Sequence, residues 1–397
     1  MRNKMKSSGI EWVGDIPSDW KTTRLKYLTA NANTGEAISK EFWDINGDYL
    51  LYTAGQLPIR STFNEFPKSL ITTENDILVA RNGAGAVQIP QLGSIYTDHV
   101  IRFTVKNDIC IKFIYYTLLL GMEKIISEAI DVSLKTLNRT EWDNLPLPFS
   151  VLSEQKAIAA FLDAQCGKID NIITDLEQQI EILKQYKTSL ITETVTKGLN
   201  KDAPMKNSGI DWIGKIPAHW EVGRIKDIMI LQRGYDLSQD EFIDGKIPVC
   251  GSNGIIGYHN KITTKGPNIT IGRSGSIGEV NYIKTDSWIH NTAIFVEDMK
   301  KNYCRYLYYV LLSNDIKNLG NGSAVPTLDR KNIQNSKFVF TKKIDEQKTI
   351  AAFLDSKCKE ISDIITEKQQ SINAMKTYKK SLIYEYVTGK KRVKGYS

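Results

Sequence analysis

The sequence predicts an α+β chain in which two mixed α/β domains form a tandem repeat with pseudo-twofold symmetry. Two long helices separate them and pair as an antiparallel coiled coil. Two observations predict this fold: long segments recur about 200 residues apart, and each copy ends in a helical stretch with a continuous apolar seam. We expect the domains at residues 1–150 and 201–342, the first helix at 151–200, and the second helix with a C-terminal tail at 343–397.

Two pairs of nearly identical segments establish the repeat. Residues 6–28 read KSSGIEWVGDIPSDWKTTRLKYL and return at 206–228 as KNSGIDWIGKIPAHWEVGRIKDI. Residues 154–174 read EQKAIAAFLDAQCGKIDNIIT and return at 346–366 as EQKTIAAFLDSKCKEISDIIT. The edges of the two copies agree closely, whereas most of each interior does not. The pattern indicates one scaffold that carries two different faces.

The interiors read as short strands with a few helices. Residues 47–105 and 245–297 contain β-branched runs interrupted by Gly, Asn and Pro, which is typical of short strands joined by turns. Residues 113–120 (FIYYTLLL) and 306–313 (YLYYVLLS) do not alternate and predict buried helices. The repeated Ile-Pro pair before a tryptophan predicts a turn held by aromatic side chains.

The long helices carry apolar residues at steps of three and four for about four heptads, which predicts a coiled coil roughly 60 Å long. Ser153 and Asp345 are candidate N-caps, and Gly198 and Gly389 are candidate C-terminal stops. Lys368 departs from the seam, and the same spacing also assigns Tyr186 and Tyr378 to it. The residues expected to carry the pairing are Leu162, Ile169, Ile173, Leu176, Ile180, Leu183, Leu354, Ile361, Ile365, Ile372, Met375 and Leu382.

Composition narrows the class of protein. The chain has 52 Lys and Arg against 45 Asp and Glu, a net charge of +7, which permits a polyanionic partner without requiring one. Its five cysteines are odd in number and widely spaced, as in a reducing compartment. No secretory signal and no apolar run of about 20 residues is visible. We therefore expect a cytoplasmic location.

Motifs for catalysis are missing from the sequence. We find no N/D-P-P-F/Y/W, no G-x-G-x-x-G after a strand and no G-x-x-x-x-G-K-[ST]. The E-x-K triplets at 154–156 and 346–348 resemble a nuclease motif but begin long helices, where a carboxylate favours the N-terminus. The four histidines lack the spacing of metal ligands. We expect no catalytic residue and no metal site.

Three motifs together carry a family resemblance: G-I-[ED]-W-[IV]-G-x-I-P-x-x-W, E-Q-x-x-I-A-x-F-L-D and L-I-x-E-x-V-T. Through them the chain resembles the specificity subunit of type I restriction–modification systems over essentially its whole length. One departure is that Leu145-Pro146-Leu147-Pro148 precedes the first helix, whereas Ser336-Lys337-Phe338-Val339 precedes the second. The second helix is therefore expected to begin in a different shape.

The resemblance implies that the chain is non-catalytic and that each variable domain reads one half of a bipartite site in double-stranded DNA. It also implies that the helices set the gap between the halves and bind two modification (methyltransferase) subunits. Separate restriction subunits would translocate and cut DNA. By this resemblance, S-adenosylmethionine, ATP and Mg belong to those partner subunits, and this chain holds no cofactor and contacts no membrane. Independently, two unlike readers in one chain should recognise an asymmetric split sequence.

Candidate DNA contacts come first from two equivalent turns. Arg81 and Arg273 follow apolar strands and precede glycine-containing turns, where an arginine can bond guanine or phosphate. Asn82 and Ser274 differ at the same position, as specificity residues would. The alternative is that each arginine ties down its own turn.

Two further groups of residues are candidates. Repeated basic loops supply possible phosphate contacts, with solvated loop charges as the alternative; they are Lys135, Arg139, Arg330 and Lys331. The non-repeating interiors supply possible base readers, namely Arg60, Lys68, Arg233, Tyr235, His259 and Lys261. The repeated tryptophans (Trp12, Trp20, Trp212 and Trp220) cannot distinguish two half-sites, so we assign them to the core or to partner docking.

Two other functions are considered beside the leading one. A DNA methyltransferase or nuclease acting alone would need a cofactor or catalytic motif that the sequence lacks. A coiled-coil scaffold joining two protein-binding modules would need no DNA, and DNA binding that weakens with salt would exclude it.

Overall fold

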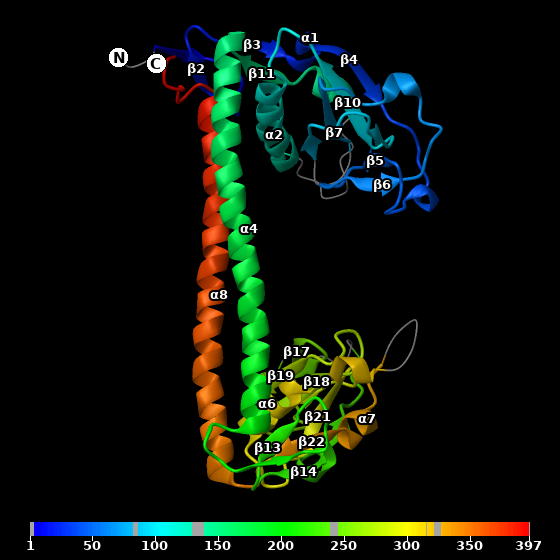
Figure 1. Cartoon of the computed structure of the whole chain (residues 1–397), viewed down its shortest axis with the longest axis vertical. Coiled ribbons are helices and arrows are strands. Elements are labelled where there is room, and N and C mark those ends of the chain that lie inside the picture. Colours follow the sequence, from blue (N-terminus) through cyan, green and yellow to red (C-terminus); the bar gives the residue numbers. More distant parts are fainter. Residues whose placement is uncertain are drawn as a thin grey trace. The chain divides into compact units, whose positions relative to one another are not determined.

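The computed structural model describes residues 4–81, 86–128, 139–238, 245–314, 316–320 and 327–396, with the side chains of 123–128 left out. The chain divides into two compact units (Figure 1). Unit 1 comprises Met1–Leu176 and Gln370–Ser397, and unit 2 comprises Glu177–Gln369. Each unit holds one mixed α/β domain together with part of each long helix, as the repeat predicts.

The domain of unit 1 (domain 1) is built on two sheets. The larger has the antiparallel order β4(Thr29–Thr34), β10(Val100–Val105), β7(Asp76–Ala80), β8(Val87–Gln88). The smaller has the order β6(Ile59–Ser61), β5(Tyr49–Tyr52), β9(Ile95–Tyr96), with β5 and β9 parallel. Two strand pairs accompany them, β1(Met5–Ser7) with β2(Asp15–Pro17) and β3(Lys21–Arg24) with β11(Pro146–Phe149). The helices are α1(Leu25–Leu28), α2(Ile111–Glu128), α3(Arg139–Asp143) and the 3-10 turns η1(Lys40–Phe42) and η2(Lys68–Leu70).

The domain of unit 2 (domain 2) repeats this topology. Its larger sheet is β15(Ile230–Arg233), β21(Ala293–Asp298), β18(Asn268–Gly272), β19(Val280–Ile283), and its smaller sheet is β17(Gly254–His259), β16(Ile247–Gly251), β20(Trp288–Ile289). The strand pairs are β12(Met205–Asn207) with β13(Lys215–Pro217) and β14(Glu221–Arg224) with β22(Lys337–Phe340). The helices are α5(Ile225–Ile228), α6(Cys304–Ser313), α7(Arg330–Asn335) and η4(Ile316–Leu319).

The central strands of the larger sheets form the middle of each domain. Every residue of β7 and of β18 is buried. The sequence of β7, DILVA, is a nearly continuous apolar run, whereas that of β18, NITIG, alternates polar residues with isoleucines although both faces are buried. Helices α2 and α6 contribute Phe113, Tyr306 and Tyr309, which are fully buried. The buried helices predicted at these positions are confirmed.

The segments that lead into the long helices have the same shape in both units, contrary to expectation. Leu147 pairs with Thr23, and Phe338 pairs with Gly223, in equivalent antiparallel registers. Alternate residues of a strand direct their backbone N–H groups to the same side of the strand. Because β11 pairs only with β3, its other side needs no N–H donors, and Pro146 and Pro148 are tolerated there.

The long helices are α4(Leu152–Lys197) and α8(Ile344–Val387), and they run antiparallel in each unit. In unit 1, Lys379 forms an ion pair with Asp170 at 2.7 Å. In unit 2, Lys368 donates to Gln179 at 2.6 Å. Within unit 1, Phe161 also packs on Tyr386, and within unit 2, Lys187 also donates to Ser362 at 2.9 Å. Residue numbers therefore fall along α8 as they rise along α4 in each unit, as the predicted antiparallel coiled coil requires.

Most of the predicted seam is buried. Leu176, Leu183, Ile365 and Met375 are half-buried, and the other eight residues are buried. Tyr186 and Tyr378 are 56% exposed, so their assignment to the seam was wrong. A straight helix drifts away from a strict heptad, and near position 186 Ile191 faces the core instead. Lys368 reaches out of the seam to the partner helix.

The helix ends match the sequence only in part. Since α4 begins at Leu152 and α8 at Ile344, Ser153 and Asp345 lie inside the first turn and are not N-caps. The stops are confirmed: Gly198 and Gly389 have φ of 71° and 70°, a left-handed conformation that glycine adopts without strain.

Candidate DNA interface

Four loops meet along one edge of domain 2, and together they form the candidate interface. The backbone N–H groups of Arg273 and Ser274 donate to the Thr292 carbonyl, at 2.8 and 3.3 Å, so the turn after β18 lies against the turn after β20. Tyr235, which follows β15, donates its N–H to the Ile289 carbonyl at 2.8 Å. The β16–β17 turn joins them, since a Cβ at Gly275 would lie 3.5 Å from Ser252 Oγ.

Domain 1 has the same edge with different side chains. The backbone N–H of Arg81 donates to the His99 carbonyl at 2.8 Å, as that of Arg273 does to Thr292. A pocket of about 550 Å³ opens beside it, with Lys40, Trp43, Asp98 and His99 among its lining residues. The ammonium of Lys40 lies 5.6 Å from the centre of the Trp43 ring. An aromatic ring and a cation at such an edge are suited to a nucleic acid.

The two predicted arginines have unlike surroundings. Arg81 donates from Nη1 to the Asp98 carbonyl at 3.1 Å, so part of its guanidinium holds the neighbouring turn. The guanidinium of Arg273 makes no hydrogen bond or ion pair with the residues that the structure describes. Ser274 lies beside it and is partly exposed. Asn82, the fourth residue of this prediction, lies outside the described residues.

The predicted phosphate contacts differ in availability. Arg330 donates to the Leu231 carbonyl at 3.1 Å and also contacts Gln232 Oε1, which ties α7 to β15. Arg139 forms an ion pair with Asp143 at 3.2 Å one turn along its own helix. Lys331 is exposed. Lys135 lies outside the described residues.

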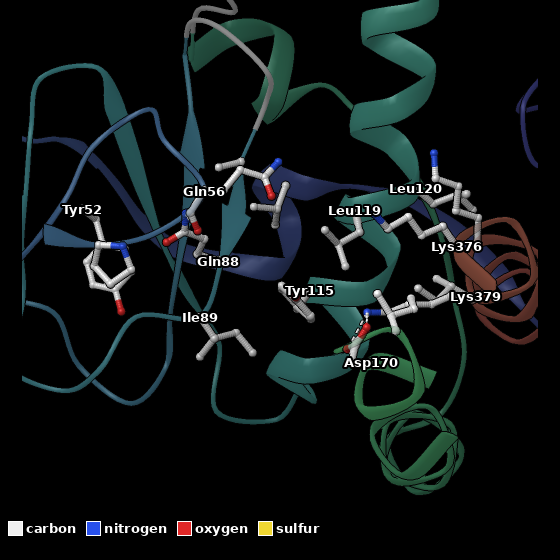
Figure 2. A pocket seen from close by; sticks show the side chains of 16 residues that line it. Tyr52, Gln56, Gln88, Ile89, Tyr115, Leu119, Leu120, Asp170, Lys376 and Lys379 are labelled. Atoms are coloured by element: carbon white, nitrogen blue, oxygen red, sulfur yellow. Dashed lines mark hydrogen bonds and ion pairs between the residues drawn. The ribbon is translucent and has the colours of Figure 1, made fainter. Parts of the chain in front are cut away.

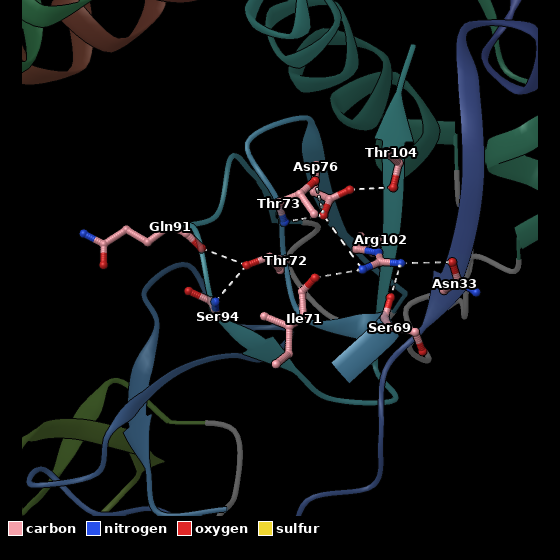
Figure 3. A network of polar contacts seen from close by, with 10 residues as sticks. All are labelled: Asn33, Ser69, Ile71, Thr72, Thr73, Asp76, Gln91, Ser94, Arg102 and Thr104. Carbon is pink, nitrogen blue, oxygen red and sulfur yellow. Dashed lines mark hydrogen bonds and ion pairs between the residues drawn. The ribbon is translucent and has the colours of Figure 1, made fainter. Parts of the chain in front are cut away.

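The predicted base readers of domain 1 lie on its outer loops. Arg60 is exposed and donates to the Gly47 carbonyl at 2.9 Å, and Lys68 is exposed on η2. A buried network holds η2 in place (Figure 3). Arg102 donates to the Ile71 and Ser69 carbonyls at 3.1 and 3.3 Å.

This network belongs to domain 1 alone. The Arg102 guanidinium lies 3.9 Å from the carboxylate of Asp76, and both side chains are buried. In domain 1, Val100 pairs with Ala80, the residue before Arg81, and in domain 2, Ala293 pairs with Gly272, the residue before Arg273. Two residues after these partners stand Arg102 in β10 and Phe295 in β21, so the two positions are equivalent. The loop edge of domain 1 is therefore supported by a buried arginine, and that of domain 2 by a buried phenylalanine.

The predicted base readers of domain 2 are partly exposed and partly buried. Tyr235 and Lys261 are exposed, and Arg233 is exposed with an ion pair to Asp236 at 3.6 Å. His259 is only 7% exposed and packs edge-to-face on Trp288 with the ring centres 5.0 Å apart. Its prediction as a base reader is contradicted, because the imidazole fills the core beneath β17.

Two duplicated polar clusters, which sequence reasoning missed, connect each domain to a long helix. The Tyr116 hydroxyl donates to Asp163 at 2.8 Å, beside a Lys112–Asp163 ion pair at 2.5 Å. In unit 2, Tyr309 donates to Asp355 at 2.6 Å, beside an Arg305–Asp355 ion pair of the same length. Burial, together with the hydrogen bond to aspartate, raises the pKa of both tyrosines above the ordinary value. The aspartates of the repeated A-x-F-L-D segments were the available signal.

A second duplicated contact involves the repeated tryptophans. Trp20 donates its indole N–H to Glu154 at 2.9 Å, and Trp220 donates to Glu346 at 3.0 Å. Both tryptophans are buried, as expected of residues common to the two copies. Trp12 is half-buried and Trp212 is exposed. Glu154 and Glu346, which belong to the two E-x-K triplets, thus anchor the tryptophan-containing segments at the start of each copy.

Figure 2 shows a pocket of about 790 Å³ in unit 1, lined by strands and helix α2 of domain 1 and by the long helices. Several of its polar groups already have partners within unit 1. Lys379 faces Asp170 in an ion pair, and the Gln88 amide donates to the Gly55 and Gln56 carbonyls at 2.8 and 3.1 Å. We interpret this pocket as a junction between the domain and the helix pair.

Among the described residues, no three His, Cys, Asp or Glu side chains gather in a way that would hold a metal ion. In the same part of the chain, no helix combines the length and apolar character that a membrane span requires. The five cysteines are free thiols, and all but Cys110 are buried.

These observations define a class of protein: a tandem of two domains alike in topology, anchored identically to paired helices and presenting two unlike loop edges. Comparison with known proteins names the family. Residues 17–184 and 217–374 each match the type I restriction modification DNA specificity domain, and the chain belongs to that family. It is a DNA-specificity protein without catalytic activity of its own.

Relatives and a solved structure agree with this assignment. The type I restriction enzyme MjaVIII specificity subunit of Methanocaldococcus jannaschii is 25% identical over 96% of this chain and 94% of its own length. The putative MjaX specificity subunit of the same organism is 27% identical over 96% of both. A chain from a structure on complex assembly and conformational transition of the type I R-M system has the same fold. Its TM-score is 0.69 at 13% identity, covering 94% of this chain and 98% of that one.

Proposed function

We propose that the loop edges of domains 1 and 2 each read one half of an asymmetric, split DNA sequence, and that the long helices fix the unread gap. The observation that carries the proposal is the combination of duplicated anchors with unlike edges. The Trp–Glu and Tyr–Asp contacts recur within 0.2 Å, whereas Arg102 and His99 are replaced by Phe295 and Thr292. Features common to both domains fix their placement, and features that differ specify bases.

We further propose that two modification subunits dock on the long helices. Exposed apolar residues recur on the long helices at equivalent positions, Ile172 with Ile364 and Tyr186 with Tyr378. Apolar side chains repeated on solvated helix faces support docking of two like partners. Restriction subunits would join the same complex. S-adenosylmethionine, ATP and Mg²⁺ would be bound by those partners, and the complex would act on cytoplasmic DNA.

The test is to map methylated adenines across the genome of cells that carry the complete complex. A split, asymmetric motif is expected. Exchanging residues 30–145 for those of a relative should change one half of the motif and leave the other half and the gap unchanged. A continuous or palindromic motif would contradict two separate readers, and the unexchanged chain serves as control.

The helices are tested separately by lengthening α4 and α8 together by one heptad. Seven helical residues add about 10.5 Å, which corresponds to about three base pairs of DNA. Both half-sites should remain unchanged while the gap grows by about three base pairs. An unchanged gap would show that the helices do not set the spacing.

A further inference from the structure

The edge strand β17 of domain 2 exposes an unusual row of apolar side chains. Ile255, Ile256 and Tyr258 are 59%, 49% and 52% exposed. The two isoleucines are consecutive, and both are exposed where the strand is bulged: Cys250 pairs with Ile255, and Val249 pairs with Gly257, which leaves Ile256 unpaired. An apolar edge strand left in water is a site for unwanted association, so proteins usually cover or charge it. A binding partner would account for its exposure.

The row is continuous with the candidate DNA interface. The β16–β17 turn packs on the turn that carries Arg273: a Cβ at Gly272 would lie 2.8 Å from the Ser252 carbonyl oxygen and 1.8 Å from that of Ser276. Gly272 and Gly275 therefore allow the two turns to touch. The turn that carries Arg273 therefore lies beside the end of β17 at which the exposed row begins.

Charge identifies the kind of partner. Residues 245–278 contain four basic residues (Lys246, Lys261, Lys265 and Arg273) and no Asp or Glu. The equivalent residues 47–84 of domain 1 contain three basic residues and four acidic ones. Apolar side chains within a positively charged, acid-free segment are complementary to a DNA groove lined by phosphates.

We propose that β17 enters the major groove of the half-site read by domain 2, where Ile255 and Ile256 contact the C5 methyl group of thymine. The major groove admits a two-stranded β ribbon, and the thymine methyl is the apolar group that base pairs present there. This inference rests on the proposed function and deepens it. It assigns at least one A·T pair to the second half-site and makes β17 a specificity element of domain 2.

The experiment uses the full chain assembled with its modification subunits, and duplexes that carry the motif found by methylation mapping. Each thymine of the second half-site is replaced singly by deoxyuridine, which differs only by lacking the methyl group. At one position at least, affinity should fall about fourfold, as expected for losing the burial of one methyl group. As a control, thymines of the first half-site are replaced in the same way. Where domain 1 makes no apolar contact with the thymine methyl group, the affinity should not change.

Variants identify the side chains involved. The double variant Ile255→Ala, Ile256→Ala should bind thymine and deoxyuridine duplexes equally. Val222→Ala, which trims another exposed apolar side chain of unit 2, should keep the fourfold difference. Thermal unfolding establishes that both variants fold.

Three results of the DNA-binding experiments would overturn the inference: a second half-site without any A·T pair, no deoxyuridine effect, or a deoxyuridine effect of the same size in the Ile255/Ile256 variant. Loss of partner subunits rather than of thymine discrimination in that variant would assign β17 to a protein interface and equally overturn it. Failure of the proposed function itself looks different, because the complex would then bind no split sequence at all.

Discussion

The Tyr309 hydroxyl and the Asp355 carboxylate of α8 lie 2.6 Å apart, and Tyr116 and Asp163 of α4 repeat this contact at 2.8 Å. Each hydrogen bond joins the buried helix of a domain to a long helix. A reader domain that must stay in register with DNA needs such a rigid connection to its spacer.

These contacts should contribute equally in the two units. Tyr309→Phe and Tyr116→Phe each remove one hydrogen bond to a carboxylate and should lower the free energy of unfolding of their unit by about 2 kcal/mol. Urea unfolding with a probe in each unit measures the effect. Tyr186→Phe, at an exposed position, is the control. If the free energy of unfolding falls in only one unit, the two equivalent hydrogen bonds do not contribute equally to stability.

Glu154 is a more costly residue to remove. It is buried and accepts hydrogen bonds from Trp20 and, at 2.8 and 3.1 Å, from Arg392. Glu154→Ala leaves the buried indole N–H without an acceptor and reduces the partners of the largely buried Arg392 guanidinium to the Asp19 carboxylate at 2.7 Å, so unit 1 should be destabilised by about 3 kcal/mol. Thermal unfolding of Lys156→Ala, at an exposed position in the same turn, should match the unchanged chain. Equal melting of Glu154→Ala and Lys156→Ala would refute the anchor.

Glu346 should make unit 2 sensitive to acid. Burial by itself would raise the pKa of its carboxyl, but hydrogen bonds from Thr341, Trp220 and His219 outweigh burial and lower it. Because the folded pKa lies below the unfolded one, the stabilisation is complete above the ordinary glutamate pKa of about 4.3 and is lost as pH falls through the lower folded pKa.

Glu346→Gln should therefore flatten the acid side of the stability curve below about pH 5. The curve is measured by urea unfolding of unit 2 at successive pH values, with Glu193→Gln on the exposed surface of α4 as the matched control. Parallel curves for Glu346→Gln and the unchanged chain would contradict the sign of the shift.

Arg273 and Arg330 should separate binding from stability. Arg273→Ala removes a guanidinium that bonds none of the described residues, and should weaken specific DNA binding by about 5-fold to 150-fold while leaving the melting temperature unchanged. Arg330→Ala removes the tie to β15 and should lower the melting temperature of unit 2. Filter binding and calorimetry on both variants test this. If Arg273→Ala instead lowered the melting temperature and Arg330→Ala weakened only DNA binding, Arg330 would be the DNA contact and Arg273 the structural residue.

Docking of modification subunits should depend on the exposed helix faces. Ile364→Asp should reduce the number bound from two to one, and Ile172→Asp combined with it should abolish binding, because each places a charge in an apolar contact. Native mass spectrometry counts the subunits. Asn373→Asp lies about 180° around α8 from Ile364 and adds the same charge as a control. Two subunits bound to the double variant would place docking elsewhere.

The repeat and the heptads were enough to predict the architecture. Segments that recur in register must fold alike, and a seam sustained over several heptads pairs only as a coiled coil. The seam assignment failed at Tyr186 and Tyr378, because the actual drift of the helix depends on its partner. The candidate interface was predicted less completely. The arginine turns were found, but His259 proved to be buried, and Arg330 was found to hold β15.

The sequence by itself determined that this protein is a duplicated scaffold with two unlike faces, because identity between distant segments is a property of the chain alone. Only the tertiary structure decided which polar residues meet. Asp163 and Asp355 look like solvated helix residues until Tyr116 and Tyr309 are seen to reach them. Such contacts join residues about 50 positions apart, and the packing of helices and sheets brings them together, which no local pattern records.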